Sequence, residues 1–256
     1  IALLSHPVDF DSAGYRLSRI GLWLQENSIR HTPTTDERMN YAAINGDLLQ
    51  LWWIAPFSSG YGGVAMIQFF GGCLTLFTTF LFSKALGFNR LNSLAGVLLL
   101  LGMPVFLTQL VTEQVDLLTA GFSTLAVYFL YRAFKDNLAT WPGWLALGLA
   151  IGTKGSLFYL GPGLILLGLI WIPGLKISGR QLLRAIPPAV ALLLLFAAPR
   201  YLENATSYNN PFGPAGHVYR LHGEGSPDGS LAQKLALNLS SYGLQTATPD
   251  SNRPLP

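Results

Sequence analysis

The fold is decided by a long apolar stretch at residues 64–82, which reads VAMIQFFGGCLTLFTTFLF. It carries no charged side chain and is long enough for a helix to cross the roughly 30 Å hydrocarbon core of a bilayer. Comparable apolar runs occupy residues 94–110, 115–134, 157–175 and 185–198, and a shorter one occupies residues 144–153. The sequence therefore predicts an all-α, polytopic bundle of transmembrane helices.

The composition agrees with a membrane protein. Charged residues make up 11% of the chain and hydrophobic residues 50%, whereas soluble domains carry roughly 25% charged residues. The only cysteine, Cys73, lies in an apolar run, so the sequence indicates neither a disulfide framework nor a cysteine metal site. A net charge of +3 without a basic, aromatic-rich cluster argues against nucleic-acid binding. Because the chain opens at Ile1 without an initiator Met, we expect a transmembrane helix to precede it.

The segment before the first apolar run is polar, and residues 9–25 read DFDSAGYRLSRIGLWLQ. Two carboxylates, Asp9 and Asp11, precede a segment with apolar residues at helical spacing, namely Leu17, Ile20 and Leu24. This pattern predicts an acidic turn followed by an amphipathic helix on the membrane surface. Residues 41–56, with Asp47 and a tryptophan pair, predict a second interfacial helix, because tryptophan favours the headgroup level.

Charge predicts the orientation, because cytoplasmic loops collect lysine and arginine. When the spans alternate in direction, one side of the membrane receives the basic residues Lys84, Arg90, Arg132, Lys135, Lys176, Arg180 and Arg184. Of the 13 acidic residues, only Asp136 falls on that side. We interpret that side as cytoplasmic. We expect residues 1–200 to form the transmembrane core, with external juxtamembrane helices at residues 9–56, and residues 201–256 to form an external tail that is truncated.

Five short motifs carry a resemblance to a known class. They are residues 11–19 (DSAGYRLSR), 45–52 (NGDLLQLW), 113–117 (EQVDL) and 148–154 (GLAIGTK), and Asn204 with residues 208–214 (YNNPFGP). In this order the chain resembles the membrane-embedded GT-C glycosyltransferases, the class of protein mannosyltransferases and lipid A aminoarabinose transferases. Arg16 stands where that class often has His, and Ser18 where it has Pro.

The resemblance implies transfer of a sugar from a polyprenyl-phosphate carrier to an acceptor hydroxyl with inversion. Asp11 is then the general base, and its alternative role is an N-cap of the following helix. Lys154 is the candidate contact for the carrier phosphate, and its alternative role is a side chain that extends to the membrane interface. Arg16 and Arg200 are further candidates for the phosphate, and their alternative role is to anchor the protein at that interface. Candidate contacts to sugar or acceptor are Glu113 and Asp116, whose alternative is helix capping, together with Asn204.

A metal cofactor is left open by the sequence. Asp9 and Asp47 are further substrate-binding candidates. Asp9 could also share a divalent ion with Asp11 or with the more distant Asp47, because oxygen ligands suit Mg²⁺ or Mn²⁺, while the alternative is a solvated turn. Two histidines, His217 and His222, have the wrong spacing for one helical metal face. The two histidines therefore predict no metal site formed by protein side chains alone.

Two other functional classes compete with the glycosyltransferase. Broken helices and a charge in an apolar stretch would suit a lipid or solute transporter, but that class predicts paired half-helices in two repeats, and the sequence has no internal repeat. The third possibility is a catalytically silent membrane subunit of a larger complex. We expect an integral protein of the bacterial inner membrane that works on its external face, with membrane lipid, a polyprenyl-phosphate-linked sugar and a glycan, lipid or protein acceptor as partners.

Overall fold

The computed structural model of the chain is all-helical over the residues it describes, which are 11–56, 63–159, 161–163, 166, 174 and 177–214. The elements begin with a π-helical turn, η1, followed by helices of four to 21 residues. In chain order they are η1 Ser12–Arg16, α1 Leu17–Glu26, α2 Arg38–Tyr41, α3 Asn45–Ile54, α4 Ala65–Ala85, α5 Arg90–Leu101, α6 Pro104–Gln109, α7 Asp116–Asp136, α8 Trp141–Thr153, α10 Gly179–Phe196 and α11 Ala198–Tyr208.

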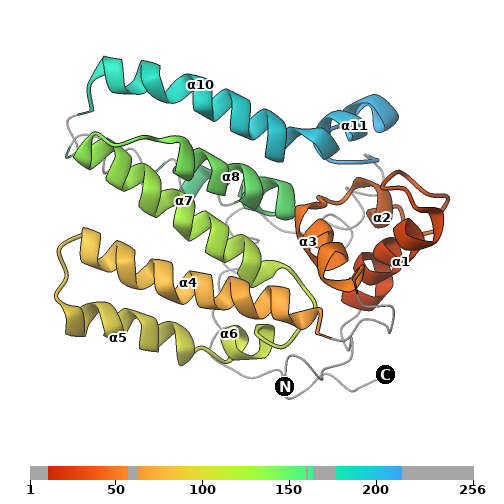
Figure 1. The fold of residues 1–256 in the computed structure, drawn as a ribbon, viewed down its shortest axis with the longest axis horizontal. Coiled ribbons are helices and arrows are strands. Elements are labelled where there is room, and N and C mark those ends of the chain that lie inside the picture. The colour runs from red at the N-terminus through yellow and green to blue at the C-terminus, as the bar shows by residue number, and fades with distance from the viewer. Residues whose placement is uncertain are drawn as a thin grey trace, which may run out of the picture.

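Three of these helices are long and apolar enough to cross a membrane, namely α4, α7 and α10. In Figure 1 the helices α5, α4, α7, α8 and α10 lie side by side, and η1, α1, α2, α3 and α11 gather at one end of them. The predicted fold class, a polytopic transmembrane helix bundle, is confirmed.

Close approach of helices holds the bundle together. A Cβ atom added to Gly71 on α4 would lie 2.4 Å from the Cα atom of Leu118 on α7, and one added to Gly121 on α7 would lie 2.8 Å from the Gly71 carbonyl oxygen. Small residues at such crossings let the two backbones pack directly. Helices in a bilayer associate through such van der Waals packing, because the hydrophobic effect does not drive them together in lipid. The pair α4 and α7 therefore forms the centre of the bundle.

A second close contact joins three elements. Gly152, near the end of α8, leaves no room for a side chain, because an added Cβ would lie 2.1 Å from the Phe196 carbonyl oxygen of α10 and 2.2 Å from the Asn45 amide nitrogen of α3. Asn45 donates to that same carbonyl at 2.7 Å. Helices α3, α8 and α10 thus meet at one point.

The expected span at residues 94–110 is not one continuous helix. Helix α5 ends at Leu101, Met103 is extended with ψ 119°, and Pro104 starts α6. Proline lacks an amide hydrogen and disfavours helical backbone in the residue before it, which accounts for the break. The 12 residues of α5 rise only about 18 Å, short of the hydrocarbon core.

The predicted amphipathic helix exists, and most of its apolar face is buried in the protein. Leu17, Ile20 and Trp23 on α1 pack against Ile54 of α3 and Val64 in a buried cluster. Leu24, expected on the same face, is exposed. Helix α3 thus supplies the apolar partner for Leu17 and Ile20, and the position of α1 on the membrane surface stays a prediction.

The two ends of the bundle differ in charge. Helix α4 ends near Lys84, α5 begins at Arg90, α7 ends near Lys135 and α10 begins near Arg180. The Lys135 ammonium donates to the Ala85 carbonyl at 3.0 Å, so these termini adjoin. Helix α11 runs across residue 200, where we expected the core to end, and the domain boundary stays a prediction. The rest of the tail, with His217 and His222, lies outside the described residues.

Candidate functional site

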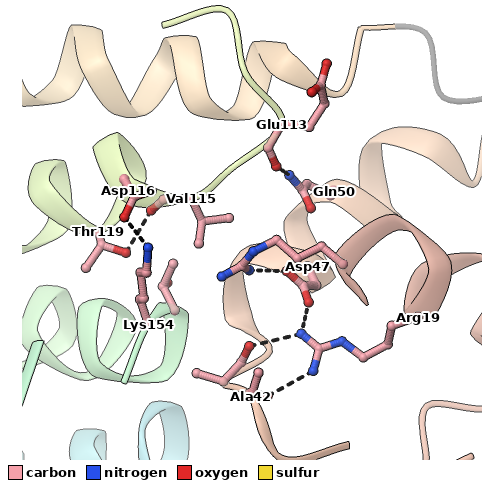
Figure 2. Close-up of polar contacts among 12 residues, drawn as sticks. Arg19, Ala42, Asp47, Gln50, Glu113, Val115, Asp116, Thr119 and Lys154 are labelled. Carbon is pink, nitrogen blue, oxygen red and sulfur yellow. Dashed lines mark hydrogen bonds and ion pairs between the residues drawn. The ribbon is translucent and has the colours of Figure 1, made fainter. Parts of the chain in front are cut away.

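A buried ion cluster joins α1 to α3. Arg16 donates from Nη1 to Asp47 Oδ1 at 2.7 Å, and Arg19 pairs with the second oxygen of the same carboxylate. Asp47 is 0% exposed and both arginines are buried. Arg19 also donates to the carbonyls of Met39, Ala42 and Ala43. Figure 2 shows the Arg19 guanidinium directed to the Asp47 carboxylate, and each oxygen of that carboxylate belongs to one ion pair.

Burial has an electrostatic cost for this cluster. Desolvation, with repulsion from Arg16 and Arg200, brings the pKa of Arg19 well below its usual value. Arg200 on α11 is buried too, and it pairs with Glu203 at 2.8 Å. The alternative roles of Arg16 and Arg200 as interfacial anchors are therefore wrong, because both side chains lie inside the protein.

Asp11 does not cap a helix through its side chain. Its Oδ1 instead accepts from Arg38 Nη1 at 2.9 Å, and the carboxylate is 48% exposed. Arg38 is also bound by Asp36, and that hydrogen bond raises the pKa of Arg38. Asp11 is thus held by an ion pair and remains open to solvent. Asp9 lies outside the described residues. Among the residues that are described, no three His, Cys, Asp or Glu side chains gather as metal ligands.

Lys154 follows α8 directly and forms an ion pair with Asp116 in the first turn of α7. The two side chains are 30% and 35% exposed. Figure 2 shows the ammonium directed to the Asp116 carboxylate, beside Thr119. The sequence predicted these two residues separately as substrate contacts, and the structure brings them into contact.

Two buried glutamines connect the N-terminal end of α7 to α3 and α4. Gln50 of α3, fully buried, donates to the Glu113 carbonyl at 2.5 Å, and Glu113 itself is buried. Gln68 of α4 accepts from the amides of Leu117 and Leu118 at 3.1 and 3.3 Å. The α7 terminus is therefore capped by Gln68, a residue that sequence reasoning missed although a glutamine in an uncharged apolar run is a visible signal.

Asn204 is buried and holds the loop after α11. Its amide nitrogen donates to the Tyr41 carbonyl at 2.8 Å and to the Pro211 carbonyl at 3.1 Å. Its predicted contact with substrate is neither supported nor contradicted by these bonds. They do place residues 210–212 beside α2.

These elements enclose a chamber of about 470 Å³. Three cations line it: Arg16, Arg38 and Lys154. Its other walls are largely aromatic and include Tyr15, Tyr41, Phe158, Tyr159, Tyr201 and Phe212. Burial raises the pKa of Tyr41 to about 12 and raises that of Tyr201 as well, so both hydroxyls are neutral donors. Sequence reasoning missed Arg38 and these aromatic residues, which are scattered along the chain without a common spacing.

A second cavity, of about 440 Å³, lies between α4 and α7 and shares Lys154 and Ser156 with the chamber. Its walls include Phe82, Val127 and Leu157. The hydroxyls of Thr119 and Ser123 in its wall donate to carbonyls of their own helix at 2.8 and 2.6 Å, so the wall offers few free polar groups. Lys154 lies where this apolar cavity, the groove between α4 and α7, meets the chamber of cationic and aromatic side chains.

Comparison with known proteins identifies the class. The family model described as dolichyl-phosphate-mannose-protein mannosyltransferase matches residues 55–201. The chain belongs to this family. It is accordingly an integral membrane glycosyltransferase that uses a polyprenyl-phosphate-linked sugar as donor. The match includes Glu113, Asp116, Lys154 and Arg200 but begins after Asp11. Searches of the curated proteins and of the solved structures found no match.

Proposed function

We propose that this family member transfers its sugar on the external face of the membrane, with Asp11 as the general base and inversion at the anomeric carbon. The observation that carries the proposal is the position of Lys154 between the groove of α4 and α7 and the chamber. A lipid-linked sugar needs an apolar channel for its chain, a cation for its phosphate, and a space lined by hydrogen-bonding and aromatic side chains for its sugar. The three occur here in that order.

In this arrangement the carrier chain lies in the groove, its phosphate contacts Lys154 and the sugar enters the chamber. Asp11 is not itself a lining residue of the chamber, but its carboxylate binds Arg38, which lines the chamber, at 2.9 Å. A half-exposed carboxylate beside the sugar site is accessible to an acceptor hydroxyl, whereas Asp47 is enclosed by two arginines. Asp11 is therefore the better base of the two.

The reaction balances with these groups. The acceptor oxygen attacks the anomeric carbon from the face opposite the phosphate, and its proton passes to the Asp11 carboxylate. The bond between the anomeric carbon and the phosphate oxygen breaks, and its electron pair stays on the phosphate. Lys154 then offsets the negative charge that develops on the leaving group.

Charge supports the external location. The acidic residues Asp11, Asp36, Glu37 and Glu203 belong to the end that carries η1, α2 and α11, and basic residues dominate the other end. Loops rich in lysine and arginine are retained in the cytoplasm. The chamber then opens outside.

The test is sugar transfer by an Asp11→Asn variant in detergent or nanodiscs. We expect turnover to fall by about 10²–10⁴-fold, the usual contribution of a general base, with carrier-lipid affinity nearly unchanged. The partly exposed pair with Arg38 contributes at most about 1 kcal/mol to stability, so the variant should fold. Asp9→Asn is the matched control and should be milder. Near wild-type turnover in Asp11→Asn would refute its role as the base.

Lys154→Ala tests the donor site independently. We expect affinity for polyprenyl phosphate to fall on the order of a hundredfold, because the phosphate loses its cation at the mouth of the groove. A folded Lys154→Ala variant that binds the carrier like wild type would contradict the proposed path of the lipid, whatever Asp11 does.

A further inference from the structure

Two anions compete for Lys154 if the donor binds as proposed. The Lys154 ammonium pairs with Asp116, and the same ammonium lines both the groove and the chamber. A carrier phosphate that reaches Lys154 therefore enters beside a carboxylate already in place. The phosphate and the carboxylate repel each other, because both are negatively charged and both lie beside the same ammonium. The two side chains are only about a third exposed, so solvent screens that repulsion incompletely.

The polar partner of the Asp116 carboxylate in the structure is Lys154. The amides of Leu117 and Leu118 at the start of α7 are bound by Gln68 instead. Its carboxylate is directed away from the helix terminus to the ammonium of a residue 38 positions further along the chain (Figure 2). The pair with Lys154 is the interaction that this side chain makes.

The carrier changes its charge during the reaction. The donor is a phosphate diester with one negative charge, and the product is a phosphate monoester, whose second pKa near 6 gives it a charge of about −1.5 to −2 at neutral pH. Lys154 attracts the product more strongly than the donor. A lone lysine at this position would favour retention of the spent carrier, which slows each turnover.

We propose that Asp116 is a positioning residue that discriminates against the spent carrier. It repels the additional negative charge of the monoester more than it repels the donor, and it supplies Lys154 with a replacement partner as the product leaves. Asp116 thus limits product retention rather than contacting the sugar. This inference rests on the proposed donor site at Lys154.

The experiment needs no knowledge of the sugar. Binding of polyprenyl monophosphate is compared with binding of its methyl ester, which keeps the chain but carries the single charge of a donor diester. In Asp116→Asn we expect monophosphate affinity to rise roughly fivefold relative to the methyl ester, the size of a partly screened charge interaction. Asp116→Glu should keep the wild-type ratio. In turnover assays of Asp116→Asn, the KM for the donor should fall and product inhibition should become stronger.

Asp136→Asn is a matched control. Asp136 lies at the opposite end of the same helix, is also 35% exposed and is paired with Arg132 four residues away. Its substitution should leave the affinity ratio unchanged. Equal affinity changes for both lipids in Asp116→Asn, or none, would overturn the role of Asp116 while leaving the donor site intact. If neither lipid binds wild-type protein better than uncharged polyprenol, the proposed donor site itself fails.

Discussion

Substitution of Asp47 by asparagine should destabilise the protein far more than any surface change. Asp47 is the carboxylate between Arg16 and Arg19, and all three side chains are buried. Its neutralisation leaves two guanidinium groups facing each other in a desolvated site, where Arg19 already has a lowered pKa. Removal of one partner from a buried ion pair costs about 3–5 kcal/mol. That loss raises the unfolded fraction by roughly a hundred- to several-thousandfold.

The assay is thermal unfolding of purified protein in detergent, followed by tryptophan fluorescence, because Trp23 lies in the core beside this cluster. Glu26→Gln is the control, since it removes the acid of an exposed pair with Arg30 and should change stability by less than about 1 kcal/mol. The reasoning is refuted if Asp47→Asn unfolds like wild type but loses sugar transfer, which would return Asp47 to the substrate-binding role predicted from the sequence.

Two further predictions concern pH and sidedness. Burial lowers the pKa of His31 below 6.5. The stability that neutral His31 contributes is therefore present above pH 6.5 and is lost as the pH falls through the folded-state pKa. The stability of His31→Gln should depend less on pH in this range, and an unaltered pH profile would exclude His31 as the cause. In a Cys73→Ala background, an impermeant thiol reagent outside right-side-out vesicles should label Gln25→Cys but not Ala139→Cys, both of which are exposed positions near opposite ends of the bundle. The reverse labelling pattern would place the chamber in the cytoplasm.

The helices themselves could largely be predicted from the sequence. Apolar runs with flanking charges mark α4, α7 and α10, because a span needs little more than length and low charge. The break before Pro104 was also visible as a glycine and a proline in one apolar run, although run length alone predicted a single span. Local patterns report local structure well.

The site was less predictable because its contacts join distant segments. Asp116 and Lys154 were each selected as charges beside apolar runs, yet only the packing of α7 against α8 shows that they form a pair. Arg16 and Arg19 followed the polar positions of an amphipathic helix, and their burial depends on Asp47 in another helix. A periodic pattern shows which face is polar, but it does not show whether water or a buried carboxylate meets that face.

The contact at Gly152 bears on how the chamber can work. Lys154 lies two residues beyond it and Asp47 two residues beyond Asn45, so the lysine proposed to bind the phosphate and the buried ion cluster extend from the same crossing of α3, α8 and α10. Nothing at that crossing can change rotamer on α8, because the residue there has no side chain. The distance between Lys154 and the ion cluster is therefore set by the backbones of α8 and α10 and by one side chain of α3, Asn45. A carrier lipid that binds as proposed has to adjust its own depth in the bilayer to meet it.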